Sequence, residues 1–165
     1  MPCGRRPRYG ARMNPSLPVH VRPSGGRDEY AALAEIWRSA VTATHAFLTR
    51  EDVDRYEARI LDAYLPRHDV HVAVDPDGRP VGFIGLDGHH VDMLFVHDDA
   101  RGRGVGRALL AWAAQGRPVL TLDVNEQNPA ARGFYASQGF EETGRSPVDG
   151  EGRPFPLVHM RRDRS

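Results

Sequence analysis

The sequence contains no lysine, and all 22 of its basic residues are arginine. Without lysine the chain has no amine for a Schiff base, no lysine nucleophile and no phosphate-binding lysine. Its single cysteine, Cys3, excludes a disulfide within the chain and a metal site built from cysteines. No apolar run approaches the roughly 20 residues that span a bilayer, so we expect a cytoplasmic protein without a membrane partner.

An excess of charge is also lacking, because 22 acidic residues balance the arginines and the formal net charge is zero. This balance argues against an arginine-driven nucleic-acid binder, so we expect no nucleic-acid partner. Hydrophobic residues make up 40% and charged residues 27% of the chain, which is ordinary for a globular protein.

Two segments differ in composition. Residues 1–16 are rich in arginine, proline and glycine without apolar periodicity, and are predicted to form a disordered tail. Residues 17–165 have the length and patterning of one domain. Met13 is a possible alternative start of translation, because the patterned sequence begins soon after it.

Apolar spacing predicts a mixed order of strands and helices, β-α-α-β-β-β-α-β-α-β-β. The chain is therefore α/β, with a sheet that cannot be wholly parallel. Thr49 and Asp52 fit a capping box at the start of the second helix. The predicted strands are 18–23, 70–75, 80–88, 90–96, 118–124, 139–146 and 154–160, and the helices are 30–44, 49–65, 104–115 and 129–138.

The stretch HDDARGRGVGRALL, residues 97–110, runs from the end of a strand into a helix. The first turn of a helix presents unpaired N–H groups and the positive end of its dipole, and glycines let an anion approach the backbone. The stretch therefore predicts a cradle for phosphate or pyrophosphate, although a glycine-rich turn with surface arginines is the alternative. Glycines and arginines alternate in it: Arg101, Gly102, Arg103, Gly104, Gly106 and Arg107.

Two common phosphate ligands fit this stretch poorly. A Walker loop needs lysine after its glycines, and the chain has none. A dinucleotide fingerprint needs its third glycine one place after Gly106, where Arg107 stands.

The spacing R-x-x-G-x-G, from Arg101 through Gly104 to Gly106, resembles the acyl-CoA signature of the GNAT N-acetyltransferase superfamily. The later segment LDVNEQNPAARGFYASQGF resembles the second signature of the same superfamily, and the order of elements agrees from about Pro18 onward. More narrowly, ATHAFL, NEQN and GRSPVDGEGRPFPL resemble the bacterial YjaB type of acetyltransferase. The second signature is carried by Asn128, Ala131, Phe134, Tyr135, Gly139 and Phe140.

This resemblance implies the GNAT fold, a mixed, mostly antiparallel sheet that is splayed in the middle and flanked by about four helices. It also implies acetyl-CoA as cosubstrate, lying in the splay between strands 90–96 and 118–124, with no metal. Asn128 could instead serve only as a helix cap before Pro129. The cosubstrate-binding residues that the resemblance implies are Leu94, Phe95, Val96, Arg101, Gly102, Arg103, Gly104, Val105, Gly106, Arg107, Asn125, Asn128, Ala131 and Tyr135.

The implied reaction is attack of a neutral amine on the thioester of acetyl-CoA, which needs an oxyanion donor and a proton for the leaving thiolate. The resemblance assigns the oxyanion donor to the backbone N–H of Leu94 and the general acid to Tyr135. An aromatic contact with Phe134 is the structural alternative for Tyr135.

Histidine titrates near neutral pH, which makes it the natural candidate for the base. His90 is one candidate, because it shares a sheet face with Asp92 on the strand that leads to the glycines. His45, at the end of the first helix, is another, and a water chain without a single base is a third. A metal site on His89 and His90 is not expected, since adjacent strand residues point to opposite faces.

We therefore expect an enzyme that acetylates a primary amine of a small molecule or a protein, as a monomer or homodimer. A CoA-binding module without turnover is the alternative. Segments 27–65 and 144–156 are expected to frame the acceptor pocket. Acidic residues that could attract a cationic amine are Asp87, Asp92, Glu126 and Asp149.

Overall fold

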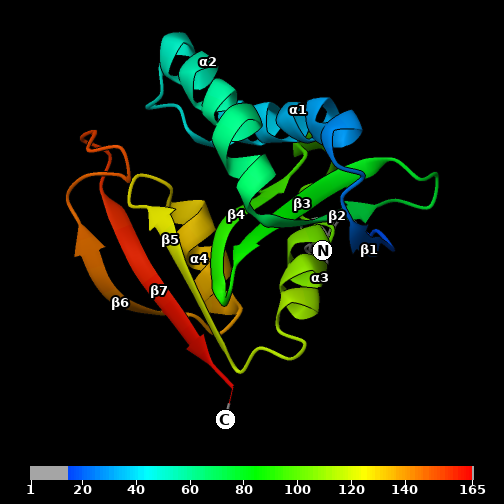
Figure 1. Cartoon of the computed structure of the whole chain (residues 1–165). Helices are drawn as coiled ribbons and strands as arrows, with labels where there is room; N and C mark the ends of the chain where they lie inside the picture. Colours follow the sequence, from blue (N-terminus) through cyan, green and yellow to red (C-terminus); the bar gives the residue numbers. More distant parts are fainter. Residues whose placement is uncertain (1–14, 165) are drawn as a thin grey trace, which may run out of the picture.

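A seven-stranded mixed sheet forms the centre of the fold (Figure 1). The computed structural model describes residues 15–164. The tail predicted at residues 1–16 and the alternative start at Met13 lie outside the described residues, except for Pro15 and Ser16. The strands are β1 (His20–Pro23), β2 (Asp69–Val74), β3 (Pro80–Asp87), β4 (His90–Val96), β5 (Val119–Asn125), β6 (Glu141–Ser146) and β7 (Leu157–Asp163).

The helices appear in the predicted order between these strands. Among residues 15–164, no helix combines the length and apolar character needed to cross a membrane. The α-helices are α1 (Arg27–Thr44), α2 (Arg50–Arg59), α3 (Val105–Ala113) and α4 (Pro129–Ser137). Short helical segments are η1 (Ile60–Tyr64), η2 (Leu65–Arg67) and η3 (Asp98–Ala100).

Strand pairing divides the sheet into two parts. The strand order is β1-β2-β3-β4-β5-β7-β6, and every neighbouring pair is antiparallel except β4 and β5. The parallel pair is registered only at His90–Thr121 and Val91–Leu122, whereas β5 and β7 pair at seven positions. Beyond Val91 the two parallel strands diverge (Figure 1). The mixed sheet splayed in the middle is thus confirmed.

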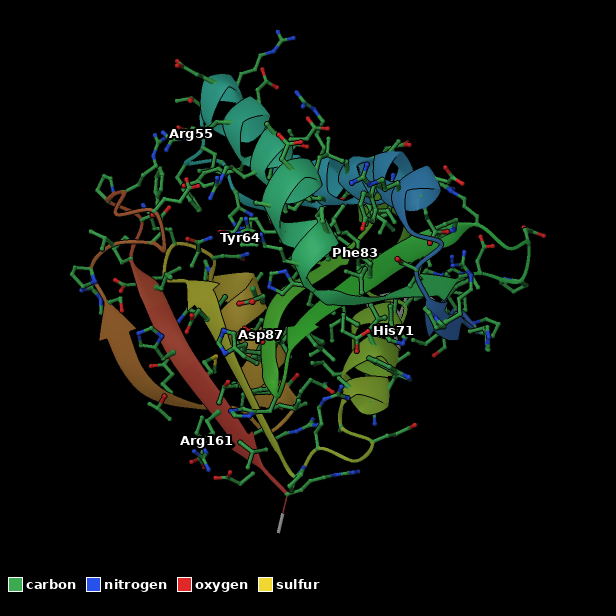
Figure 2. All side chains as sticks on the ribbon, in the orientation of Figure 1. Arg55, Tyr64, His71, Phe83, Asp87 and Arg161 are labelled. Carbon is green, nitrogen blue, oxygen red and sulfur yellow. The ribbon has the colours of Figure 1, made fainter. Side chains whose placement is uncertain are left out.

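Two hydrophobic clusters cover the two faces of the sheet. Leu33, Trp37 and Val41 of α1 pack with β2, β3 and β4 on one face. Phe83, labelled in Figure 2, is fully buried in this cluster. On the other face the cluster is built around Leu109 and its neighbours in α3, with Phe134 and Tyr135 of α4 packed against it. Burial of these side chains holds the helices on the sheet.

The second predicted helix, 49–65, has the predicted start but a different end. Thr49 and Asp52 form the capping box in both directions, which confirms that prediction. After Arg59 the helix widens into the π-helical turn η1 and then tightens into η2. Pro66 stands in η2, and its ring and missing N–H do not allow an α-helix to continue.

Candidate active site

The divergence of β4 from β5 leaves one edge of β4 without a strand partner. Opposite β3 the register shifts so that Gly85 pairs with Met93 and Leu86 with Val91, which makes Asp92 an additional, bulged residue. From Asp92 to Val96 no described strand pairs with β4 on its β5 side. An unpaired strand edge can accept hydrogen bonds from an extended, amide-containing ligand.

Two cavities lie at this splay, and His45 and Phe95 line both. The splay cavity, of about 340 Å³, lies between β4, the glycine loop, α3 and α4. The aromatic cavity, of about 230 Å³, lies between α1, α2, β4 and the connection between β6 and β7. A ligand in one cavity can therefore meet a ligand in the other at His45.

Most of the predicted cosubstrate residues come together in the splay cavity. Arg103 does not line it, and its guanidinium Nε donates instead to the Pro15 carbonyl at 3.1 Å. Asn125 lines the aromatic cavity. The predicted residues that line the splay cavity are Leu94, Phe95, Val96, Arg101, Gly102, Gly104, Val105, Gly106, Arg107, Asn128, Ala131 and Tyr135.

The glycine loop needs its glycines for two different reasons. Gly102 and Gly104 have φ of 71° and 86°, a left-handed conformation that side chains with a Cβ disfavour. A Cβ on Gly106 would lie 3.1 Å from the ring of Phe134. Gly104 also stands immediately before α3, whose first turn presents unpaired N–H groups toward an anion.

Helix α4 supplies one capping residue and one tyrosine to the splay cavity. The Asn128 side chain accepts a hydrogen bond from the Ala131 N–H at 3.2 Å, so it does act as the helix cap. The ring of Tyr135 packs 5.3 Å from Phe134 and 5.7 Å edge-on from Phe140. Burial raises the pKa of Tyr135, which keeps its hydroxyl protonated at neutral pH.

The aromatic cavity has an outer wall that is fixed by contacts between α2 and the β6–β7 connection. The Tyr56 hydroxyl donates to Asp149 at 2.6 Å, and Arg153 pairs with Asp52 at 2.6 Å. Glu151 pairs with Arg59 at 2.9 Å. The lining is rich in aromatic rings, namely Trp37, Phe47, Tyr56, Tyr64, Phe95 and Phe155, and carries the carboxylates of Asp92, Asp149 and Glu151.

The hydrogen bonds of His45 determine which of its ring nitrogens carries the proton. The Thr44 hydroxyl donates its only proton to the Ala40 carbonyl at 2.7 Å. Its oxygen, 2.7 Å from His45 Nδ1, must therefore accept, so Nδ1 is protonated and Nε2 has a free lone pair. Burial lowers the pKa of His45, which keeps the ring neutral at neutral pH. His45 thus has the protonation state of a base.

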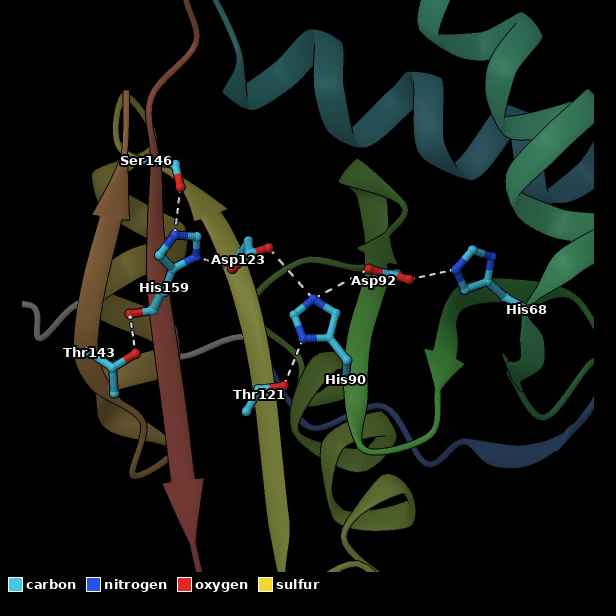
Figure 3. A network of polar contacts seen from close by, with 8 residues as sticks. All are labelled: His68, His90, Asp92, Thr121, Asp123, Thr143, Ser146 and His159. Atoms are coloured by element: carbon cyan, nitrogen blue, oxygen red, sulfur yellow. Dashed lines mark hydrogen bonds and ion pairs between the residues drawn. The ribbon is translucent and has the colours of Figure 1, made fainter. Parts of the chain in front are cut away.

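His90 lies in a polar network that crosses the sheet (Figure 3). It lines neither of the two cavities. Its Nδ1 is 2.7 Å from the Thr121 hydroxyl, and its Nε2 is 3.3 Å from Asp92 and 3.6 Å from Asp123. The Asp123 carboxylate raises the pKa of His90. A raised pKa favours the charged form of the ring, and the charged form cannot accept a further proton.

Only two of the four acidic residues predicted to attract an amine line a cavity. Asp92 and Asp149 line the aromatic cavity, whereas Asp87 and Glu126 line neither cavity, and Glu126 pairs with Arg145. Thr44, which fixes the tautomer of His45, had no signal in the sequence, because its role depends on a hydroxyl proton directed back into α1. Within residues 15–164 no group of His, Cys, Asp and Glu is arranged to hold a metal ion.

Comparison with known proteins gives one matching family model, the acetyltransferase (GNAT) domain, over residues 35–163. The peptidyl-lysine N-acetyltransferase YjaB of Salmonella typhimurium is 44% identical over 142 residues, covering 86% of this chain and 97% of that protein. The solution structure of apo-form YjaB from Escherichia coli superposes with a TM-score of 0.82 at 42% identity, covering 90% and 100% of the two chains. The PaiA N-acetyltransferase of Thermoplasma acidophilum, solved with coenzyme A, superposes at 0.71 with 18% identity, covering 89% and 99%.

Proposed function

The chain belongs to the GNAT family of acetyltransferases, and we propose that it transfers the acetyl group of acetyl-CoA to the side-chain amine of a lysine in a protein acceptor. One observation carries this proposal: two cavities of different chemistry meet at a neutral histidine. The splay cavity suits the phosphates and pantetheine arm of CoA, and the aromatic cavity suits an amine on an aliphatic stem.

The splay cavity offers CoA two kinds of backbone contact. The glycine loop and the first turn of α3 present N–H groups to the pyrophosphate, with Arg101 and Arg107 nearby as positive charges. The free edge of β4 from Asp92 to Val96 lies beside the path of the amide-rich pantetheine arm. The guanidinium of Arg103 has no part in this proposal, because its Nε donates to the Pro15 carbonyl.

The aromatic cavity favours a lysine side chain over a free amino acid. Its rings can enclose four methylenes, and its carboxylates attract the ammonium as it enters. None of the lining residues is an arginine, and the nearby Arg59 and Arg153 are already paired with Glu151 and Asp52, so the α-carboxylate of a free amino acid would enter without an unpaired positive partner. The YjaB proteins, at 44 and 45% identity, are peptidyl-lysine acetyltransferases by name, which supports the same choice.

In the proposed reaction, His45 and Tyr135 carry out different proton transfers. Nε2 of His45 accepts one proton from the lysine ammonium, and the neutral amine attacks the thioester carbon, so that a C–N bond forms while the C–S bond breaks. Leu94, on the unpaired part of β4, supplies the N–H that stabilises the negative carbonyl oxygen. The Tyr135 hydroxyl gives its proton to the departing sulfur and regains one from the nitrogen.

Thiol release with a panel of peptides tests this function. Each peptide has blocked termini and one internal lysine, and its matched control carries arginine at that position. We expect thiol release and an acetylated lysine with at least one lysine peptide, none with its arginine control, and at least about tenfold lower kcat/KM with free lysine. A higher kcat/KM for free amino acids would overturn the protein acceptor. Binding of CoA without turnover on any amine would favour a non-catalytic CoA-binding module.

A further inference from the structure

The two parts of the sheet are joined by very little backbone. On one side lie β1 to β4, on the other β5, β7 and β6, and only two residue pairs of β4 and β5 connect them. One further backbone bond, from the Thr121 N–H to the His89 carbonyl at 3.0 Å, lies at the same end. The splay cavity begins beyond this short seam, at Leu94 of β4, and its opposite wall includes α4, which follows β5 in the chain.

The side chain of His90 crosses this seam at its paired end. It reaches from β4 to two residues of β5, with Nδ1 2.7 Å from the Thr121 hydroxyl and Nε2 3.6 Å from Asp123 (Figure 3). On its own strand the same Nε2 lies 3.3 Å from Asp92, the bulged residue at which the unpaired edge begins. His90 therefore ties both strands together beside the residue where they part.

We propose that His90 is a positioning residue for acetyl-CoA, whose side chain clasps β4 to β5 and so sets the width of the splay cavity. The inference rests on the proposed role of that cavity as the cosubstrate site. It gives His90 a different role from that of a base: His90 touches neither cavity and acts through the strands that it joins.

Several charged or titratable groups surround the clasp, and together they favour a protonated ring. The carboxylates of Asp92 and Asp123 approach Nε2 from β4 and β5, and the charge of Asp87, at the end of β3, acts on it from further away. Two further histidines contact the same carboxylates from the outer sides, since His68 is 2.5 Å from Asp92 and His159 is bonded to Asp123.

The strength of the clasp should therefore decrease as the pH rises. Because the pKa of His90 in the folded chain is raised, the ion pair with Asp123 is complete below the ordinary histidine pKa and is lost as the pH rises through the raised value. A side chain that only filled space would affect cosubstrate binding equally at every pH.

The test compares CoA binding by the unaltered chain, His90→Gln and the control His159→Gln, from about pH 6 to about pH 9. Glutamine keeps a hydrogen-bonding side chain but removes the positive charge. His159 belongs to the same network, yet it joins β5 to β7, which already pair at seven positions. We expect His90→Gln to weaken CoA binding about three- to tenfold near pH 6, with the ratio to the unaltered chain approaching one at high pH. His159→Gln should bind CoA as the unaltered chain does.

The melting temperature of His90→Gln shows whether this variant folds as the unaltered chain does. If it folds poorly, a second variant carries the test. Asp123→Asn removes the partner charge and should reproduce the loss of affinity and its pH dependence. Equal CoA affinity of His90→Gln and the unaltered chain across the range, or equal losses in His90→Gln and His159→Gln, would overturn the clasp while leaving the cosubstrate site intact. Absence of CoA binding by the unaltered chain would overturn the cosubstrate site and the clasp with it.

Discussion

Replacing His45 by glutamine isolates the proposed base. Glutamine has a similar size, and its amide N–H can donate to the Thr44 oxygen in place of His45 Nδ1, but the amide does not take up a proton at neutral pH. A positioned general base contributes about 10²- to 10⁴-fold to the rate. Burial lowers the pKa of His45 and makes it a weaker base, which places the expected loss near the lower end of this range. We therefore expect kcat to fall about 10²-fold while the KM for acetyl-CoA stays unchanged.

The pH profile of kcat/KM with a lysine peptide provides the assay. In the unaltered enzyme the rate should decline as the pH falls through the lowered pKa of His45, and His45→Gln should lack this decline. The lowered pKa also affects stability. The neutral His45 ring contributes to folding stability above the ordinary histidine pKa, and this contribution is lost as the pH falls through the lowered pKa of the folded chain. His89→Gln, at an exposed position in the β3–β4 turn, is the matched control. A kcat for His45→Gln within about threefold of the unaltered enzyme would refute the reasoning.

Three other substitutions test the site and its walls. Tyr135→Phe should lower thiol release about 10²-fold with little change in melting temperature, because the hydroxyl has no hydrogen-bond partner among the described residues and the ring contacts remain; a large drop in melting temperature would contradict this. Gly104→Ala should lower the stability by about 1 kcal/mol, because φ is 86°, and should raise the KM for acetyl-CoA. Gly116→Ala, at φ 72° and away from the cavity, should lower the stability without changing this KM. Asp52→Asn should lower the melting temperature and raise the KM for a lysine peptide but not for acetyl-CoA, because it breaks the Arg153 contact at the outer wall; equal rises in both KM values would show that the wall is not specific to the acceptor.

Features determined by local spacing could be predicted from the sequence. The order of the strands and helices, the capping box at Thr49 and the glycine loop all depend on residues within a few positions of one another. The bulge at Asp92 could not be predicted, because it results from pairing with β3, and the π-helical turn of η1 leaves no mark in the apolar periodicity. Arg103 shows the same limit, since its pattern suits a phosphate contact but its guanidinium is bonded to Pro15.

The two candidate histidines look alike in the sequence and differ in their surroundings. His45 has no carboxylate partner in its hydrogen bonding, and burial alone lowers its pKa. His90 lies between carboxylates on two strands, and Asp123 raises its pKa. Opposite shifts of this kind separate the roles of two otherwise identical groups. They support the proposal that His45 accepts the proton, and they suit His90 to an ion pair.

The two proposed substrate sites are built from different parts of the chain. This explains why single residues could be predicted for the cosubstrate site, whereas mainly whole segments, 27–65 and 144–156, could be predicted for the acceptor site. CoA would be held mainly by backbone groups, and the glycines that expose this backbone stand together in one stretch. The aromatic cavity is built from side chains far apart in the sequence, such as Tyr56 and Asp149, 93 positions apart, and Asp52 and Arg153, 101 positions apart. No short motif can encode such a wall. Because the two cavities share His45 and Phe95, a change in the separation of β4 and β5 would, under the proposed function, also change how the amine meets the thioester.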